Sequence, residues 1–264
     1  DAYMDPDGDG YTNLEEFEAG SDPNDAASHP PLVLVYSTYL GGGDSDYGWG
    51  VTVDNEGAVY LCGETGSGDF PTVDPYRGSL NDIFLSKFSS SAGFLLYSTY
   101  LGGGGSDYAR AVAVGSDAEV YLTGYTSSGD FPTANPYQPA SKGGETVFIS
   151  KFSSAGSALI YSTYLGGSDY DQGEDIKIDD TGSAYLGGVT YSPDFPTADA
   201  FQSDFGGAGW TWGDGFIARI SPSGSALLYS TYLGGSSDDR VTGIALNSNG
   251  IIAATGDTAS TDFP

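Results

Sequence analysis

The sequence predicts an all-β protein, a β-propeller of four-stranded antiparallel blades, and three observations lead to this fold. The string YSTYLGG begins at Tyr36, Tyr97, Tyr161 and Tyr229, so the chain repeats itself at intervals of 61, 64 and 68 residues. Between these marks the same order of short alternating runs and glycine turns recurs. The 41 glycines and 20 tyrosines suit short strands joined by tight turns. Repeats of this length indicate a propeller or an array, and four short strands make one blade.

Each repeat supplies its strands in a fixed order. In the first repeat the runs are Val51–Val53, Ala58–Leu61 and Ile83–Phe88, and the next YSTY run supplies the fourth strand. With the Val51 run innermost, three complete blades follow one another. The fourth blade begins at Val241 and stops at Pro264, before its third strand. About four blades are therefore represented, and the last one is incomplete.

The first hairpin of most blades closes on a glycine. Gly57, Gly182 and Gly250 each stand last in a four-residue turn, where a positive φ lets the turn match the strand twist. The second repeat has Ala118 at this place. We therefore expect that hairpin to be more strained or differently shaped.

The pattern of the repeat resembles a known family. YSTYLGG is followed by a DxYG-like start, a V-x-VYLTG-like strand pair and SGDFPT. This order resembles the SBBP repeat of bacteria and archaea over roughly Leu32 to Pro264. The resemblance implies a β-propeller fold and an exported protein. It implies no particular activity, because one fold carries many functions.

Residues 1–28 carry a calcium-binding pattern of the EF-hand type, with a short helix after it. Calcium takes six to eight oxygen ligands, and the spacing supplies them from Asp5, Asp7, Asp9, the Tyr11 carbonyl, Asn13 and Glu16. The loop resembles those of dockerins and of bacterial thrombospondin type 3-like segments. Thr12 replaces the usual aliphatic residue, so a paired calcium sensor is not expected. A solvated acidic linker is the alternative. Residues 29–31 would then link this segment to a propeller of residues 32–264.

The scarce basic side chains fall on a repeated position. Three of the eight lie at one place on the third strand of successive blades, and they are Lys87, Lys151 and Arg219. The DFP motif places an acid once per blade, at Asp69, Asp130 and Asp194. Because a buried charge requires a partner, we expect structural ion pairs between these two sets. The alternative is that the basic side chains are exposed and only solubilise the protein.

A break in the repeat marks a candidate ligand site. The third blade inserts residues 205–215, which hold Trp210, Trp212 and Asp214. Exposed tryptophans stack on sugar rings or anchor a partner, and packing within the blade is the other interpretation. A residue repeated in every blade serves the blade, whereas a catalytic site breaks the symmetry. We therefore assign no catalytic residue and do not expect an enzyme; a polysaccharide hydrolase or lyase is the least favoured interpretation.

Composition excludes several partners and cofactors. With 36 acidic and 8 basic side chains the formal charge is −28, which repels nucleic acid. No apolar run is long enough to span a bilayer, so we expect no transmembrane segment. Cys62 is the single cysteine, so no intrachain disulfide forms. The single histidine, His29, excludes a multi-histidine zinc site. Calcium is the one cofactor expected.

These observations predict a secreted or cell-surface protein with a structural or adhesive role, such as a surface-layer or filament subunit. The alternative is a module that binds an extracellular glycan, peptide or protein. The incomplete last blade leaves an open strand edge. Leu32–Leu40 of a second molecule could complete it and generate a head-to-tail ring or filament. A longer natural chain that completes its own blade is the other possibility.

Overall fold

The structure is a computed structural model of the chain. It describes residues 3–6, 8, 11–19, 21–25, 36–77, 83–90, 93–207 and 213–264. The chain divides into two compact units, Asp1–Tyr39 and Leu40–Pro264, and each is described by itself. The predicted linker, residues 29–31, lies outside the described residues.

The first unit contains the short helix α1 (Asn13–Ala19), which the sequence predicts. Thr12 and Glu15 form a capping box at its start. The Thr12 backbone N–H donates to Glu15 Oε2 at 2.8 Å, and the Glu15 N–H donates to Thr12 Oγ1 at 3.4 Å. Glu15 and Glu16 both lie in the first turn, where negative charge complements the helix dipole.

The second unit consists of successive antiparallel sheets, which confirms the predicted all-β propeller fold. Three sheets have four strands in the order of the chain, and the fourth has two. The strands are β1 (Asp46–Val53), β2 (Val59–Thr65), β3 (Ile83–Phe88), β4 (Leu95–Leu101), β5 (Asp107–Val114), β6 (Val120–Thr126), β7 (Thr146–Phe152), β8 (Leu159–Leu165), β9 (Asp171–Ile178), β10 (Ala184–Thr190), β11 (Asp214–Ile220), β12 (Leu227–Leu233), β13 (Asp239–Leu246) and β14 (Ile252–Thr258).

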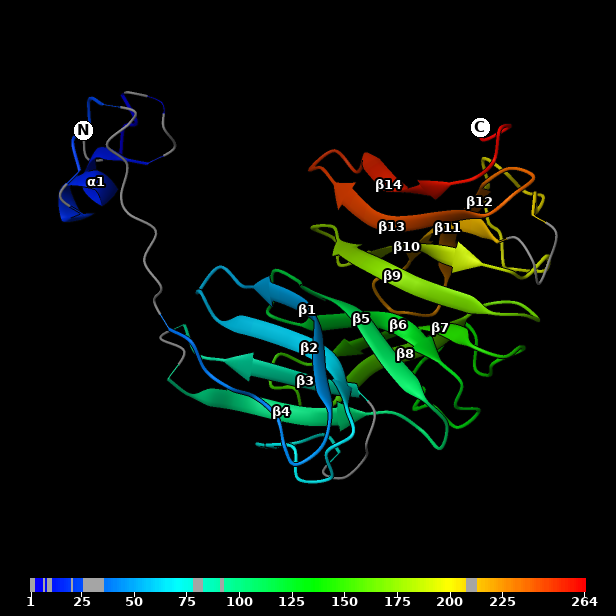
Figure 1. Cartoon of the computed structure of the whole chain (residues 1–264), viewed down its shortest axis with the longest axis horizontal. Helices are drawn as coiled ribbons and strands as arrows, with labels where there is room; N and C mark the ends of the chain where they lie inside the picture. Colours follow the sequence, from blue (N-terminus) through cyan, green and yellow to red (C-terminus); the bar gives the residue numbers. More distant parts are fainter. Residues whose placement is uncertain are drawn as a thin grey trace. The chain divides into compact units, whose positions relative to one another are not determined.

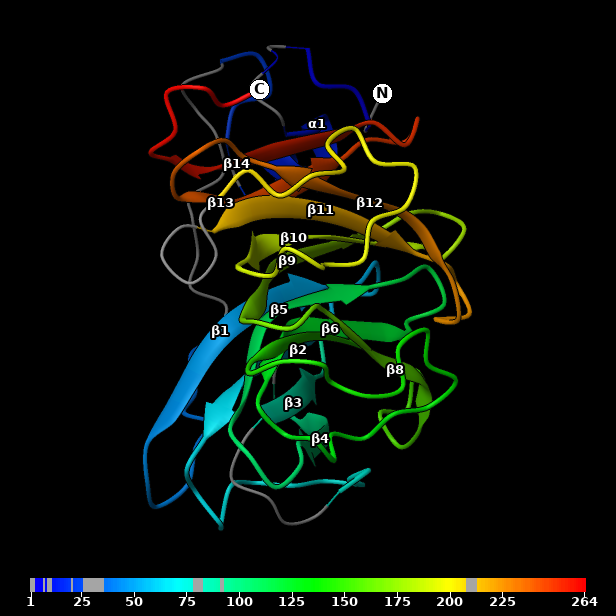
Figure 2. The same cartoon turned by 90° about the vertical axis from the view of Figure 1, so that its right-hand side faces the viewer.

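The sheets stack on one another in chain order, from the blue sheet to the red one in Figures 1 and 2. The first strands of neighbouring blades, β1, β5, β9 and β13, lie next to each other. Each of them contains a β-bulge, which leaves Trp49, Arg110, Glu174 and Thr242 without a partner in the strand register. The bulge therefore recurs at one position in every blade, while the side chain there differs.

The hydrophobic core lies between the sheets. Each junction buries apolar side chains from both of the blades that meet there, as expected for stacked sheets. Cys62 of the first blade belongs to one cluster with Val112 and Leu122 of the second. The second junction is filled by a cluster that includes Tyr121, Ile149, Ile176 and Leu186, and the third by one that includes Tyr185, Val241 and Ile244.

The first hairpins confirm the expectation of strain at Ala118. Gly57, Gly182 and Gly250 have φ of 82°, 83° and 77°, and Ala118 has φ of 57°. The turn keeps the same closing hydrogen bond, from Ala118 N–H to Gly115 O at 3.0 Å, as Gly57 makes to Asp54 O at 2.9 Å. The second hairpin therefore has the common shape, with a side chain in a backbone region that favours glycine.

The last blade has only its first two strands, β13 and β14, as the repeat count predicts. The prediction for Leu32–Leu40 is only partly testable, since residues 32–35 lie outside the described residues. Tyr36–Leu40 is not a strand. The later YSTY segments form strands because each pairs with the third strand of the blade before it, and no strand of the described residues precedes Tyr36.

Candidate functional site

The first strand of each blade begins with an aspartate that accepts a hydrogen bond from the loop before that strand. Asp171 is buried, and its Oδ2 accepts hydrogen bonds from Gly167 N–H at 2.8 Å and Ser192 Oγ at 3.1 Å, while Thr190 donates to Oδ1. Oδ2 of Asp46, Asp107 and Asp239 accepts the same glycine and serine donors. Burial raises the pKa of Asp171 to about 7 in spite of these hydrogen bonds. Because it recurs in every blade, this aspartate serves the fold. The sequence signal for it is its place ten residues after each YSTYLGG tyrosine.

The aspartates of the DFP motif fasten the same loop from the other side. Asp194 Oδ1 accepts hydrogen bonds from the Ser168 N–H at 2.7 Å and Oγ at 2.8 Å. Burial alone would raise the pKa of Asp194, but these hydrogen bonds hold it below its usual value. The corresponding backbone donors are Gly43 for Asp69, Gly104 for Asp130 and Ser236 for Asp262. These carboxylates have a structural role, but not as ion-pair partners of the third-strand bases.

The predicted ion pairs have different acidic partners. Lys87 pairs with Asp54 at 3.5 Å, Lys151 with Glu119, and Arg219 with Asp179 at 2.8 Å. Each cation also lies over a tyrosine ring of the second strand, with 4.7 Å from Lys87 Nζ to Tyr60, 5.1 Å from Lys151 Nζ to Tyr121 and 5.0 Å from Arg219 Cζ to Tyr185. The basic residues therefore do have repeated structural partners, but the pairing with Asp69, Asp130 and Asp194 is wrong.

Antiparallel pairing explains this correction. Lys87 lies opposite Tyr60, at the beginning of β2, whereas Asp69 follows the end of that strand. The two are at opposite ends of the sheet, and a strand of this length spans roughly 20 Å. The first hairpin lies beside Lys87 and supplies Asp54 instead.

The predicted ligand site in the third blade is only partly visible. Trp210 and Trp212 lie outside the described residues. Asp214 begins β11 and is fully buried, so it does not fit a role in contact with an external ligand. Its Oδ2 accepts hydrogen bonds from Gly206 N–H at 2.8 Å and from Gln202 Nε2 at 3.2 Å. Burial and, after it, the negative charge of Asp239 raise the pKa of Asp214 to about 6.

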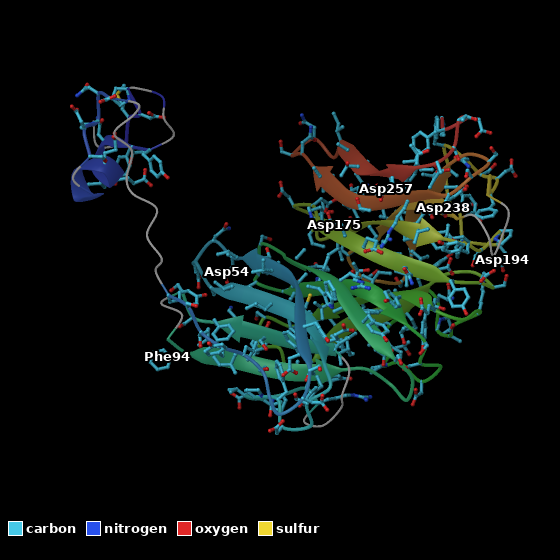
Figure 3. The ribbon with its side chains drawn as sticks, in the orientation of Figure 1. Asp54, Phe94, Asp175, Asp194, Asp238 and Asp257 are labelled. Atoms are coloured by element: carbon cyan, nitrogen blue, oxygen red, sulfur yellow. The ribbon has the colours of Figure 1, made fainter. Side chains whose placement is uncertain are left out.

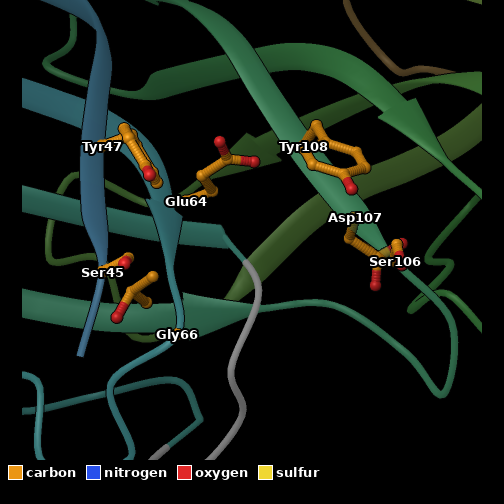
Figure 4. A pocket seen from close by; sticks show the side chains of 8 residues that line it. Ser45, Tyr47, Glu64, Gly66, Ser106, Asp107 and Tyr108 are labelled. Atoms are coloured by element: carbon orange, nitrogen blue, oxygen red, sulfur yellow. The ribbon is translucent and has the colours of Figure 1, made fainter.

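A groove of about 330 Å³ opens between the first and second blades. Its walls come from the start of β1 and the end of β2 on one side and from the start of β5 on the other (Figure 4). Glu64 projects toward Tyr108, and Tyr47 lies on its other side. Ser45 and Ser106 add hydroxyl groups to the lining. Asp107 also lines the groove, but its oxygens already accept hydrogen bonds from Thr126, Ser128 and Gly103.

An aromatic strip connects the two tyrosines of the groove, and we define it by the residues Tyr47, Trp49, Arg110, Tyr125 and Tyr108. The Tyr47 and Trp49 rings stack at 6.4 Å, and Arg110 Cζ lies 4.6 Å from the Trp49 ring centroid. Arg110 donates to Tyr125 Oη at 2.9 Å, and the Tyr125 ring lies 4.8 Å from that of Tyr108. Tyr47 and Trp49 remain 53% and 50% exposed, so about half of each side chain is accessible to a ligand.

The aromatic strip breaks the repeat symmetry. At the positions of Tyr47 and Trp49, the third repeat has Gln172 and Glu174 and the fourth has Arg240 and Thr242. In the fourth repeat, Arg240 forms an ion pair with Glu174. This site was not predicted from the sequence, because the insertion in the third blade was taken as the break in the repeat. The sequence signal for this site is that the residues after the aspartate at the start of each first strand differ between the repeats.

The calcium-binding prediction rests on residues of which the structure describes only some. Asp7 and Asp9 lie outside the described residues. Asp5, Tyr11, Asn13 and Glu16 are described, and Asp5 Oδ1 accepts a hydrogen bond from the Gly8 N–H at 2.7 Å. Across the described part of the chain, no three His, Cys, Asp or Glu side chains gather as a metal site. Nor does any described helix have the length and apolar character needed to cross a membrane.

Comparison with known proteins agrees with the repeat architecture. Three segments, residues 35–71, 96–132 and 160–196, match the SBBP family model, described as a beta-propeller repeat. The chain is also 25% identical over 250 residues to the regulatory protein FlaEY of Caulobacter vibrioides. That match covers 91% of this chain but 25% of the relative, so the chain spans about a quarter of that protein's length. The four-stranded sheets and the three matched segments together show that this chain contains SBBP-type beta-propeller repeats.

Proposed function

We propose that the propeller is a glycan-binding module without enzymatic activity, which acts outside the cell in a structural or adhesive role. The observation that carries this proposal is the groove between the first two blades with its aromatic strip. Exposed aromatic faces stack on the apolar face of a sugar ring, and Glu64, Ser45 and Ser106 can bond its hydroxyl groups. The charge of −28 disfavours acidic polysaccharides, so the ligand class is a neutral glycan.

The acids of the groove support binding in preference to hydrolysis. A glycosidase needs two carboxyl groups that face the sugar. Of the two in the groove, Asp107 is buried and engaged by the loop before β5, and its equivalents in other blades have the same partners. Glu64 is left as the carboxylate able to accept hydrogen bonds from a ligand.

Calorimetric titration with neutral oligosaccharides tests this proposal. Tyr47→Ala and Trp49→Ala should each weaken binding about 10-fold or more, because an aromatic anchor of a binding site contributes on the order of 2 kcal/mol. Phe94→Ala is the matched control, because Phe94 is a similarly exposed aromatic residue in the loop before β4 (Figure 3). The absence of binding to any neutral glycan, or equal affinities of Trp49→Ala and the wild type, would contradict the proposal.

We also propose that the N-terminal segment binds calcium and stiffens the connection to the propeller. The order of acidic residues from Asp5 to Glu16 supports this proposal, as does the start of α1 within the second half of the loop pattern. Extracellular modules of this kind bind calcium at ~10⁻⁴ to 10⁻³ M. Glu16→Gln should abolish calcium uptake in calorimetry, while Glu56→Gln, an exposed acid of the propeller, should leave it unchanged. Uptake that survives Glu16→Gln would reject this loop as the site.

A further inference from the structure

The groove between the first two blades contains a carboxylate, Glu64, that has no basic partner among the described residues. Glu64 is half-buried on β2, and none of the ion pairs of the described residues involves it. In the fourth blade the acid at the same register position, Asp257, lies opposite Arg240. In the first blade the residue opposite Glu64 is Tyr47. The charge of Glu64 is therefore available to a group from outside the chain.

Two tyrosine rings flank this carboxylate. Tyr47 lies on one side of Glu64 and Tyr108 on the other (Figure 4). The face of an aromatic ring carries negative partial charge and attracts a cation, and the carboxylate between the rings adds a full negative charge. The three groups together therefore favour a cation in the groove over an anion.

No basic side chain of the described residues lines the groove. The lining contains two acids, Glu64 and Asp107, and neither lysine nor arginine. Burial raises the pKa of Asp107, so Glu64 is the stronger source of negative charge. The base of the aromatic strip, Arg110, stacks on Trp49 and donates to Tyr125. A cationic ligand therefore meets no positive side chain in the lining itself.

This combination is not repeated at the next junction. There Tyr125 stands at the register position of Glu64, and its ring lies 4.8 Å from that of Tyr108. Gln172, at the position of Tyr47, donates to Glu145. The groove lies between two complete four-stranded sheets. The carboxylate between two rings is therefore a feature of the junction between the first and second blades.

A protonated amino group fits this lining better than a metal ion. Calcium takes six to eight oxygen ligands, whereas the side chains available here are Glu64 and the hydroxyl groups of Ser45 and Ser106. An ammonium group has three N–H donors, and these three acceptors match them in number. The groove volume of about 330 Å³ is at the small end of the range for ligand pockets, which suits one or two sugar units.

We propose that the groove binds the protonated amino group of an amino sugar, with Glu64 as its ion-pair partner and the Tyr47 and Tyr108 rings on either side. This ligand class rests on the proposed glycan-binding function, and it adds one charged group to a ligand that is otherwise neutral. The net charge of −28 attracts such a ligand toward the protein. Acetylation of the amino group removes the ion pair but leaves the sugar ring able to stack.

Calorimetric titration with a glucosamine oligosaccharide and with its fully N-acetylated form of the same length tests the proposal in physiological salt. The wild type should bind the free amine about 10-fold or more tightly, because acetylation abolishes the charged hydrogen bond to Glu64. Glu64→Gln should bind the two forms with equal affinity. Asp257→Asn is the matched control, because it removes the same charge from the equivalent position of the fourth blade, and it should retain the wild-type preference.

The outcomes separate this ligand class from the proposed function. Equal binding of the two forms by the wild type, with weaker binding of both by Trp49→Ala, would overturn the amino sugar and leave glycan binding in place. An equal loss of preference in Glu64→Gln and Asp257→Asn would also overturn it, because net charge would then select the amine. Tighter binding of a lysine-containing tripeptide than of the glucosamine oligosaccharide would assign the groove to a protein side chain and reject the amino sugar.

Discussion

The carboxylate of Asp214 faces that of Asp239 across Gly234. Asp214 Oδ1 and Asp239 Oδ2 lie 2.7 and 2.9 Å from the position that a Cβ at Gly234 would take, and both side chains are buried. Asp214 Oδ1 has no hydrogen-bond partner within the described part of the chain. Burial of the Asp214 carboxylate and, after it, the nearby negative charge of Asp239 disfavour the ionised form, so the folded state favours a proton on Asp214.

Because of this proton, the folded chain should lose stability as the pH rises, which is the opposite of the usual effect of an aspartate. The pKa of Asp214 is about 6 in the folded chain, against 3.8 for an ordinary aspartate. Between these values the folded state binds more protons than the unfolded state, so the free energy of unfolding falls as the pH rises from about 4 to 6, by ~3 kcal/mol. Asp171, with a pKa of about 7, extends the fall to pH 7. Urea unfolding across a pH series measures the slope.

Asp214→Asn should remove much of this dependence. The amide retains an acceptor for Gly206 and Gln202 and places a donor toward Asp239 in the position of the unpaired oxygen. We expect the variant to be more stable than the wild type by about 2 kcal/mol at pH 8. Asp204→Asn, an exposed acid nearby, should change little. A variant that is no more stable than the wild type at pH 8 would show that the two carboxylates do not oppose each other.

Ala118→Gly should stabilise the protein by about 1 kcal/mol. Ala118 has φ of 57°, a conformation that costs a residue with a Cβ roughly 1–2 kcal/mol, and glycine recovers part of this in spite of its greater entropy when unfolded. The converse change, Gly250→Ala, is the matched control, because its nearest neighbour is 3.9 Å away and only backbone strain is added. Thermal unfolding should move the two variants in opposite directions; a shift of both in one direction would refute the strain argument.

Lys151→Met should destabilise the second blade. Lys151 is almost completely buried between Glu119 and the Tyr121 ring, so its loss leaves a partly buried acid without its partner. We expect a loss of about 2 kcal/mol, less than for a fully buried pair because Glu119 retains some contact with water. Lys177→Met is the control, since the Lys177 side chain is 42% exposed, and it should cost under about 0.5 kcal/mol. If Lys151→Met and Lys177→Met lowered the free energy of unfolding equally in chemical denaturation, the contacts of Lys151 would not be the source of the stabilisation.

Cys62 should be unreactive in the folded chain. It is fully buried in the first blade junction, and burial raises the pKa of its thiol to about 12, so little thiolate forms at neutral pH. Disulfide reagents should label it only as fast as the first two blades separate, and at once in guanidinium. Rapid labelling under native conditions would mean that this junction opens readily.

The four-stranded blades and their strand order were predictable because comparison of the repeats shows which segments recur. The recurring YSTYLGG string gives the period, and glycines such as Gly57 give the turns. The partner of Lys87 was not found, although antiparallel pairing places this residue at the end of the sheet that also holds Asp54. The groove was missed for another reason. Tyr47 and Tyr108 belong to different blades, and no sequence spacing shows that their side chains line one groove.

The matched SBBP segments are out of phase with the blades, and this has a consequence for folding during synthesis. Residues 96–132 comprise the last strand of one blade, β4, and the first two strands of the next, β5 and β6; residues 160–196 have the same content in β8, β9 and β10. A blade is therefore complete only when the first strand of the next matched segment has been synthesised. Each sheet closes only when the following repeat emerges, so the nascent chain carries one open sheet at a time, and its exposure lasts for about one repeat of elongation.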